Sequence, residues 1–346
     1  MLAAGHACGL PAWRRLRLPP RNEAVVVRTL QLDWGRLMAD QFGTVARLRQ
    51  TLSMLTIRGA RRVLAHTPVE RWPITSWLRG RVFRYGYGDS ELSVTVRGVT
   101  LSLPGGDASI VPSLVGGYYE ELELAIFEQL ARDASLIADV GGNIGLYSCV
   151  GAAAAPSIRV VAFEPAPLNL DYLRRNVNTN GLAERVEVVA AAVSDQPGTA
   201  RLHLADGIGN HSLAAGRANS QTYVDVEVKT IDGYFADERL DLLKVDVEGF
   251  DVHVLRGAKS RLHGDRPAVF VELLTERLEE GGAAPQELVT MLCDSYGHVF
   301  VVDEPRRVVR EASREELLAL VEERVHTNLI AVERPEQVAV VAGFIG

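Results

Sequence analysis

One stretch of this sequence, residues 136–147, limits most strongly what the chain can fold into. It opens with the apolar run Leu136-Ile137-Ala138, short enough for a buried parallel strand, and reaches an acid at Asp139. Glycine adopts positive φ and lets a backbone approach a ligand closely, so the glycines that follow predict a strand, a tight turn and a helix: Gly141, Gly142 and Gly145. The free N–H groups of that helix would point at the turn, which favours a polar, partly anionic cofactor there.

The spacing of these glycines separates two classes of cofactor. Dinucleotide sites favour G-x-G-x-x-G, with the pyrophosphate on the helix N-terminus. This chain has G-G-x-x-G, with Asp139 at the strand tip before it. S-adenosylmethionine (AdoMet) carries an amino-acid group and no pyrophosphate, so acids are favourable beside it. The pattern therefore favours AdoMet over NAD, and an ordinary glycine-rich turn is the alternative without a ligand.

The next strands of the pattern end in further polar residues. A second strand is expected at 159–163 and ends in Glu164, about twenty residues past the glycines, where α/β nucleotide folds place the acid that binds ribose hydroxyls. An acid at this position would bind the ribose of AdoMet or of NAD, so it does not distinguish the two cofactors. A helix at 167–177 and a third buried strand at 186–193 follow, and Ser194 lies at the tip of that strand, where an adenine ring would sit.

A fourth strand, expected at 240–245, ends in alternating charged and apolar residues. If the strand runs that far, its alternation places three side chains on one face: Lys244, Asp246 and Glu248. The carboxyl end of a central parallel strand is where α/β folds form their ligand crevice. We therefore interpret this tip as functional, and the alternative is a solvated strand end with a Lys–Glu pair.

Composition argues against several classes of protein. With 346 residues, 47% of them hydrophobic, the chain can form one large or two modest domains. A net charge of −7 argues against a nucleic-acid binder, which would carry a basic footprint. No apolar run approaches the roughly 18–20 residues of a membrane span, and the N-terminus does not resemble a signal peptide. The three cysteines are far apart, so we expect no disulfide framework, no metal site and a cytoplasmic protein: Cys8, Cys149 and Cys293.

Three parts of the chain differ in pattern. Residues 1–75 are rich in arginine, and apolar positions from Val45 recur at helical spacing, so we expect a partly helical extension with a loose start. That helix would pack on the main domain or dock on an anionic partner. Residues 76–118 form a lead-in with a β-hairpin from Leu92 to Leu103. Residues 119–346 carry the α/β alternation.

The second half of this alternation contains further elements and one polar loop. Antiparallel strands are expected at 198–204 and 222–231, and the loop at 206–212 between them is either a substrate lid or merely a connection. We expect further elements to the end of the chain, in this order: a short helix ending at 254–257, a strand at 268–273, a helix at 285–295, a strand at 298–302, a helix opened by a capping box at 313–316, and a strand at 328–332.

Together these motifs resemble those of the FkbM family of AdoMet-dependent methyltransferases. The resemblance covers about residues 119–273 and rests on the following segments: Asp139 to Gly145, Phe163-Glu164-Pro165, Asn176 with Asn180-Gly181, Val193-Ser194-Asp195, Leu243 to Gly249, and Leu255 to Ala258. Tyr119-Glu120 also resembles a Tyr-Glu that precedes the family's first strand, whereas Gly142 stands where the family often has alanine. The family implies an α/β, class I (Rossmann-like, seven-stranded) methyltransferase fold and O-methylation of a sugar, glycolipid or polyketide hydroxyl. It does not fix the acceptor.

The resemblance also suggests a cofactor site built from several strand tips. The glycines and Asn143 would shape the methionine pocket, Asp139 or Glu120 would bind the ammonium group, and Glu164 would bind the ribose. The residues expected to bind AdoMet are Glu120, Asp139, Gly141, Asn143, Gly145, Glu164 and Ser194.

Methyl transfer to a hydroxyl group also calls for a base that removes its proton. Asp246 is our first candidate and Glu248 the second. Lys244 would orient the base or pair with Glu248, and His211, in the polar loop, is a weaker candidate for the base. A metal-assisted variant would place Mg²⁺ between Asp246 and Glu272.

Two other classes of function fit part of the sequence. An NAD-dependent oxidoreductase would share the glycine turn and Glu164, although the glycine spacing is wrong for a pyrophosphate. A non-catalytic AdoMet-binding scaffold would keep the fold without the chemistry. The expected partner is therefore a small-molecule or glycan acceptor, and the oligomeric state is left open.

Overall fold

The computed structural model of this chain describes its residues unevenly. The described residues are Leu52, Leu55, Thr56, 81–83, 85, 86, 88, 91–107, 109–117, 119–205, 207–209, 211–214, 222–304 and 306–345. The predicted Arg-rich extension and its helix from Val45 lie outside the described residues, apart from Leu52, Leu55 and Thr56. Residues 50–346 form one compact unit, which therefore includes the hairpin together with the α/β region.

The predicted hairpin is confirmed. β1 (Leu92–Val96) pairs antiparallel with β2 (Val99–Leu103) around the turn at Arg97 and Gly98. Two asparagines of the helix α6 (Pro167–Thr179) and its C-terminus hold β2 in place. Asn176 accepts from the backbone N–H of Ser102 at 2.7 Å, and Asn180 from that of Thr100 at 2.8 Å. The hairpin is thereby fixed to the α/β region, and α3 (Val111–Gly116) follows it.

The centre of the fold is an eight-stranded sheet in the order β12-β11-β13-β10-β9-β3-β4-β5. Five neighbouring strands, from β5 to β10, run parallel, whereas β13 is antiparallel to both β10 and β11. The strands are β3 (Leu136–Val140), β4 (Arg159–Phe163), β5 (Val186–Val189), β9 (Leu242–Val245), β10 (Ala268–Leu273), β11 (His298–Asp303), β12 (Val308–Glu311) and β13 (Thr327–Val332). The predicted α/β class with a parallel sheet is confirmed.

A second sheet corrects one sequence prediction. The segment 186–193 is not one strand, because β5 ends at Val189 and the chain then leaves the main sheet. The next residues form β6 (Ala191–Val193), which pairs parallel with β8 (Tyr223–Lys229). β8 in turn pairs antiparallel with β7 (Gly198–His203), as the alternation predicted.

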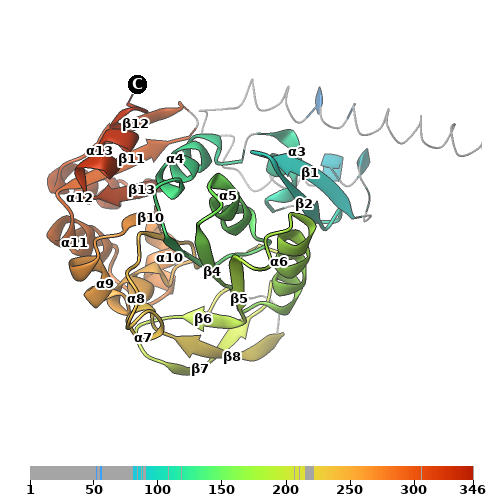
Figure 1. Ribbon diagram of the computed structural model, residues 1–346, viewed down its shortest axis with the longest axis horizontal. Helices are drawn as coiled ribbons and strands as arrows, with labels where there is room; N and C mark the ends of the chain where they lie inside the picture. Colours follow the sequence, from blue (N-terminus) through green and yellow to red (C-terminus); the bar gives the residue numbers. More distant parts are fainter. Residues whose placement is uncertain are drawn as a thin grey trace, which may run out of the picture. The chain divides into compact units, whose positions relative to one another are not determined.

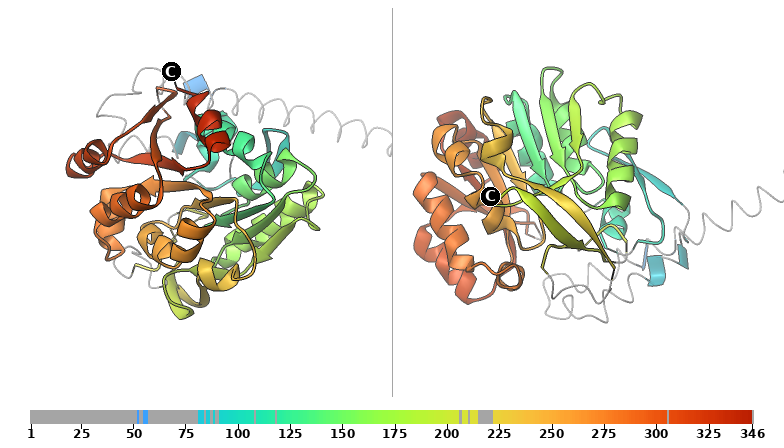
Figure 2. Two further views of the ribbon diagram at one scale, coloured as in Figure 1. Left: turned by 60° about the vertical axis from the view of Figure 1, so that its left-hand side comes forward. Right: turned by 90° about the horizontal axis from the view of Figure 1, so that it is seen from below.

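Helices cover both faces of the central sheet (Figures 1 and 2). One core cluster gathers apolar residues of α4 (Glu121–Ala131), α5 (Leu146–Ala154), α6 and α13 (Pro335–Ala342) against one face. A second cluster packs the other face against further helices: α7 (Ile231–Tyr234), α8 (Asp251–Arg256), α9 (Lys259–Gly264), α10 (Thr275–Glu280), α11 (Pro285–Ser295) and α12 (Arg314–Glu322). Successive strand residues divide between the two clusters, as in a doubly wound sheet: Ile137 belongs to the first and Ala138 to the second.

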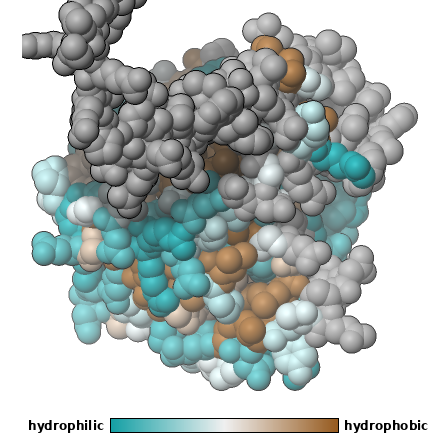
Figure 3. Space-filling view, turned by 90° about the vertical axis from the view of Figure 1, so that its right-hand side faces the viewer, coloured by the Kyte–Doolittle hydropathy of each residue, from teal (hydrophilic) through white to brown (hydrophobic). Residues whose placement is uncertain are grey.

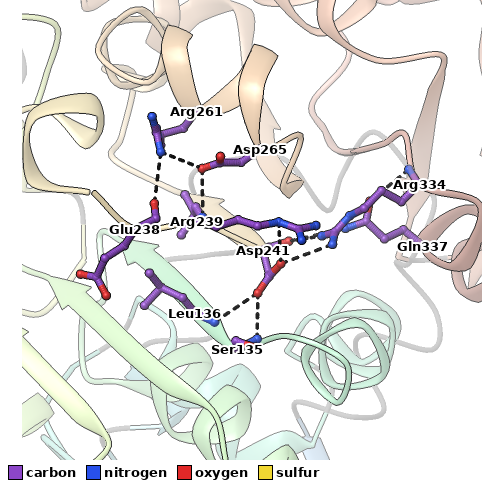
Figure 4. A network of polar contacts seen from close by, with 10 residues as sticks. Ser135, Leu136, Glu238, Arg239, Asp241, Arg261, Asp265, Arg334 and Gln337 are labelled. Atoms are coloured by element: carbon purple, nitrogen blue, oxygen red, sulfur yellow. Dashed lines mark hydrogen bonds and ion pairs between the residues drawn. The ribbon is translucent and has the colours of Figure 1, made fainter. Parts of the chain in front are cut away.

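A polar network joins the amino-terminal ends of β3 and β9 to the start of α13 (Figure 4). Asp241 accepts from the N–H of Ser135 at 2.9 Å and of Leu136 at 3.4 Å. The same carboxylate lies 3.3 Å from a guanidinium nitrogen of Arg334 and 3.6 Å from Arg239. Each oxygen of this acid therefore has partners.

The surface of the described residues carries separated apolar groups. Figure 3 shows apolar side chains interspersed with hydrophilic ones on one face. Large exposed apolar side chains include those of Leu168, 45% exposed, and Tyr223, 48% exposed. Among the described helices, none has the length and apolarity needed to span a bilayer.

Candidate functional site

The predicted glycine turn follows β3 and adopts the expected backbone. Gly141, Asn143 and Gly145 have φ of 84°, 49° and 88°, and Gly145 caps the start of α5. A Cβ on Gly141 would lie 1.9 Å from the backbone oxygen of Asp246. Glycine is therefore required at position 141 for both its conformation and the close approach of the β9 tip.

Glu164 follows β4 and faces the same turn. Its two carboxylate oxygens accept from the backbone N–H groups of Asn143 and Ala166, each at 2.8 Å. Burial raises the pKa of Glu164 to about 7, although these two hydrogen bonds oppose the rise. This carboxylate is thus held rigidly at the position where the sequence predicted a ribose ligand.

A cavity opens at the carboxyl ends of β3, β4 and β9. Three of the predicted site residues with acidic side chains line it, namely Glu164, Asp246 and Glu248. Its lining also includes Ser109, Ile110, Tyr119, Val140, Gly141, Asn143, Phe163, Pro165, Asn169, Ala191, Ala192, Val193, Leu202, Ile208, Gly209, His211, Ser212, Leu213, Val247 and Phe250. No lysine or arginine occurs among these described lining residues, so the wall suits a cation better than a pyrophosphate.

Lys244 and Asp246 form an ion pair at the tip of β9. The ammonium nitrogen of Lys244 lies 3.1 Å from Asp246 Oδ2 and 4.4 Å from the centre of the Tyr147 ring. The lysine side chain is 5% exposed and that of Asp246 is 37% exposed. Burial lowers the pKa of Lys244, but the carboxylates around it raise it above its usual range. A buried cation therefore stands behind a carboxylate that faces the cavity.

Glu248 does not continue the alternation, so its predicted place beside Lys244 and Asp246 on one strand face is wrong. β9 ends at Val245, and Glu248 has a φ of 54° in the turn that follows. Its carboxylate lies 3.8 Å from Arg277 of α10. Lys244 accordingly pairs with Asp246, and Glu248 lines the cavity from the turn that follows β9.

Two carboxyl groups of the α4 region converge on the hydroxyl group of Tyr147. That oxygen lies 2.8 Å from Glu120 Oε2 and 3.0 Å from Glu123 Oε1. A hydroxyl group donates one proton, so both contacts are hydrogen bonds only when one glutamate is itself protonated. Burial, with repulsion by Glu123, raises the pKa of Glu120 well above its usual range, and burial raises that of Glu123 to about 7. This group of residues therefore holds a proton near neutral pH.

Four predicted cofactor residues lie outside the described lining of the cavity: Glu120, Asp139, Gly145 and Ser194. Asp139 is 1% exposed and accepts from Ser148 of α5, and its Oδ1 has no partner among the described residues. Burial raises its pKa, against the effect of Lys244. Ser194 donates from its backbone to Lys229 at 2.9 Å, and the three residues before it line the cavity instead.

His211 lines the cavity, and its hydrogen bonding argues against a role as base. Its Nδ1 accepts from the backbone N–H of Ala205 at 3.0 Å, so the neutral ring carries its proton on Nε2. Burial lowers its pKa, which keeps the ring neutral. Nε2 is buried with no partner among the described residues, so His211 can donate a hydrogen bond to a ligand.

The carboxylate proposed to share a metal with Asp246 has a partner of its own. Glu272, near the end of β10, lies 2.6 Å from Nε2 of His326. Among the described residues, no group of three or more side chains has a metal-binding arrangement.

Sequence reasoning overlooked several residues of the site. Asn169 of α6 and Ser109 before α3 line the cavity, and Glu123 lies behind it. Position 169 lies five residues after Glu164 in the helix that starts beside the cavity, which was the available signal for it.

The sheet order, with β13 inserted antiparallel between β10 and β11, and an acidic cavity beside a glycine turn define a class I AdoMet-dependent methyltransferase. The profile of the methyltransferase FkbM domain matches residues 139–300. The chain is 30% identical over 182 residues to methyltransferase sdnD of Sordaria araneosa, covering 43% of this chain and 69% of that protein. The chain belongs to the FkbM methyltransferase family, and its cofactor is AdoMet.

Two further proteins named FkbM are similar to this chain, one in sequence over a shorter stretch and one in structure. The 31-O-demethyl-FK506 methyltransferase FkbM of Streptomyces tacrolimicus is 38% identical over 71 residues, or 20% of this chain and 26% of that protein. A crystal structure of methyltransferase FkbM from Methylobacillus flagellatus is 16% identical, with 64% of this chain and 54% of that chain covered. Its TM-score of 0.37 is too low to carry an argument about this protein.

Proposed function

We propose that this protein transfers the methyl group of AdoMet to a hydroxyl oxygen of a sugar, glycolipid or polyketide acceptor, with Asp246 as the base. The observation that carries the proposal is the Lys244–Asp246 pair, which presents one carboxylate to the cavity beside the glycine turn. The name of the Streptomyces relative, a 31-O-demethyl-FK506 methyltransferase, supports an oxygen acceptor. The acidic lining supports a cationic cofactor and argues against NAD.

The residues present fit AdoMet, which supplies an activated methyl group on a sulfonium. The Oδ1 of Asn143 is buried without a partner among the described residues, so it can accept a hydrogen bond from an ammonium group. Glu164 is fixed to accept from ribose hydroxyls. Asp139 and Glu120 lie outside the described lining of the cavity, and burial raises the pKa of both carboxyl groups, so neither is proposed as a direct ligand of the ammonium group.

The protein's main task in this proposal is to orient the acceptor. Alignment of the reacting atoms supplies on the order of 7–11 kcal/mol, and a positioned base adds about 10²–10⁴-fold. Lys244 holds the Asp246 carboxylate through their ion pair, which makes it the orienting partner. Glu248 is the second candidate because Arg277 already engages its carboxylate.

The test compares two conservative variants. Asp246→Asn is expected to lower methyl transfer by at least about 10²-fold and to change the dissociation constant of AdoMet little. Glu248→Gln serves as the matched control, with a smaller loss of turnover. Loss of AdoMet binding in Asp246→Asn, with no separate defect in turnover, would contradict the role of Asp246 as the base.

Further measurements separate the remaining alternatives. Turnover that persists in EDTA would eliminate the metal-assisted variant with Glu272. AdoMet binding without turnover on any hydroxylated acceptor would favour a scaffold. A cytoplasmic location stays a prediction from the cysteines, of which Cys149 and Cys293 are free thiols.

A further inference from the structure

A second groove lies beside the cofactor cavity, between the hairpin and two helices. Its apolar lining comes from β1, α3 and α4 and consists of Val94, Val96, Leu114, Val115, Leu124 and Ala125. The other described residues of its lining are Thr95, Arg97, Gly117, Tyr119, Glu121 and Arg307. Aliphatic side chains from three separate elements therefore meet in one groove, which we call the hairpin groove.

The charged groups of the hairpin groove are already paired within the chain. Arg97 forms an ion pair with Glu128 of α4, and Arg307 forms one with Glu121. These guanidinium groups and carboxylates therefore have partners before any ligand binds. What remains for a ligand is apolar surface, whose removal from water is favourable for an apolar molecule.

The hairpin groove keeps part of this apolar surface in contact with water. Val94, Val96 and Val115 pack against the first core cluster but are only partly buried. Contiguous apolar surface of this kind marks a binding groove, whereas single exposed apolar residues need no explanation. An aliphatic chain would cover these valines without burying a polar group that lacks a partner.

Two features connect the hairpin groove to the cofactor cavity. Tyr119 lines both of them. Ile110, the N-cap residue of α3, lines the cavity, and Leu114 lines the hairpin groove. The Leu114 N–H donates to the Ile110 carbonyl group at 3.0 Å, so the two residues are one helical turn apart on the same face, about 6 Å along the axis. An extended ligand is therefore long enough to reach from one to the other.

We propose that the hairpin groove binds an aliphatic part of the acceptor, while a hydroxyl group of the same molecule lies beside Asp246 in the cavity. This inference rests on the proposed function and narrows the acceptor to a molecule with an extended apolar part, such as a lipid or polyketide chain. A free sugar does not fit the hairpin groove, because its hydroxyl groups would be buried against valine and leucine side chains without partners.

Two primary alcohols test the hairpin groove in protein loaded with S-adenosylhomocysteine, which has no methyl group to transfer. Each buried CH₂ group strengthens binding up to about fourfold, so 1-octanol should bind at least about tenfold more tightly than 1-butanol. Isothermal titration measures both dissociation constants. Equal affinity for the two alcohols in the unmodified protein would overturn the proposal.

A matched pair of variants assigns that preference to the hairpin groove. In Ala125→Phe the added ring fills the groove, so the preference for 1-octanol should fall below about twofold. Gln129→Phe places the same ring on α4 outside the described lining and should keep the full preference. A preference that persists in Ala125→Phe would overturn the proposal.

Ile110→Trp tests whether one molecule spans the cavity and the hairpin groove. The larger side chain narrows the passage along α3, so the preference for 1-octanol should again fall below about twofold, while 1-butanol still binds. An unchanged preference would mean that the chain lies in the groove without its hydroxyl group in the cavity, which would overturn the role of the groove in acceptor binding. AdoMet affinity is measured alongside, because Ile110 also lines the cavity.

The outcomes distinguish this proposal from the proposed function. Failure of the alcohol measurements would overturn the hairpin groove alone, since AdoMet binding and the role of Asp246 are tested without it. Full methyl transfer by Asp246→Asn would overturn the proposed base, and the alcohol preference would still report on the groove. If Ala125→Phe does not fold, Val115→Asp decides, because a carboxylate in the groove opposes an aliphatic chain and should abolish the preference.

Discussion

The two ends of the central sheet differ in how their acidic side chains are paired with positively charged groups. At the amino ends, Asp241 is surrounded by donors: two backbone N–H groups and the guanidinium groups of Arg239 and Arg334 (Figure 4). At the carboxyl ends, the buried cation Lys244 is influenced by four acidic residues: Asp246, Asp139, Glu120 and Glu123. The first arrangement has positive partners for its acid, whereas the second has more acids than cations.

This difference indicates what each end does. Paired charges at the amino ends fix where β3, β9 and α13 meet, a contribution to stability that needs no ligand. An excess of carboxyl groups at the carboxyl ends is unfavourable in the empty protein, because buried carboxylates repel one another. That excess favours a cation such as AdoMet in the adjoining cavity. The excess of carboxyl groups over cations is therefore a property of the cofactor site. Substitutions at the two ends should differ in their effects on the free energy of unfolding and on AdoMet affinity.

The largest effect is expected for Lys244→Met. Removal of the buried cation leaves the surrounding carboxylates without a partner and should lower the free energy of unfolding by about 3–5 kcal/mol at pH 8. Urea denaturation measures it. The loss should shrink at pH 5, where Glu123, whose pKa burial raises to about 7, is protonated. Lys229→Met, which removes a more exposed lysine 2.6 Å from Glu227, is the control and should cost at most about 1 kcal/mol. Equal losses at both pH values would contradict the charge imbalance.

The next effect tests the opposite end. Asp241→Asn replaces one carboxylate oxygen by an NH2 group that cannot accept, so either the Ser135 N–H or the Arg334 guanidinium group loses its acceptor, and the negative charge beside Arg334 is also lost. We expect a loss of about 2–3 kcal/mol in the free energy of unfolding. The dissociation constant of AdoMet, measured by isothermal titration, should not change. A weakened AdoMet affinity in a fully folded variant would show that the two ends are coupled. It would contradict the view that the amino end contributes only to stability.

Sequence reasoning located most of the parallel sheet. β4 and β10 have the bounds that their apolar runs predicted, as does α11. Strands buried on both faces appear in the sequence as continuous apolar segments, which glycine, proline and acids end clearly. β12 and α13 were not predicted, because their short alternations resemble ordinary surface segments until the sheet edge is in place.

The site was predicted less completely, for a physical reason. Asp139, Gly141 and Glu164 lie at or directly after the ends of strands, so their pattern is visible in the sequence. Glu123 and Asn169 are polar residues on helices, which resemble a solvated face in a sequence. Their burial depends on contacts with distant residues: Asn169 meets Ile208, 39 positions away, and Glu123 meets Asn328, 205 positions away. Such contacts exist only once the sheet has assembled.

A smaller effect concerns the pH dependence at the carboxyl end. Burial raises the pKa of Glu123 from its ordinary value near 4.5 to about 7. Its stabilising contribution is therefore fully present below the unfolded pKa and is lost as pH rises through about 7. Glu123→Gln carries no such charge, so its stability relative to the unmodified protein should improve by about 3 kcal/mol between pH 4 and pH 8. Urea denaturation across this range measures the change.

The matched control for that prediction lies on the same helix. Glu121 has a side chain that is 48% exposed and pairs with Arg307. Glu121→Gln should therefore show no comparable change over the same pH window, because a half-exposed side chain loses little of its hydration on folding and its ion pair is screened by water. A parallel pH profile for both variants would place the titrating proton elsewhere than in the Glu120–Tyr147–Glu123 group.

The smallest effect is expected for Ser194→Ala, which separates the sequence prediction from the geometry. The Ser194 hydroxyl group contacts Asp195 at 3.2 Å and lies outside the described lining, so AdoMet affinity should change less than twofold. Ala192, two residues earlier, lines the cavity, and Ala192→Leu adds three carbon atoms there. We expect that change to weaken AdoMet binding about tenfold, the equivalent of about 1.4 kcal/mol. The reverse order of effects would mean that the third strand meets the cofactor through its polar tip and not through its apolar wall.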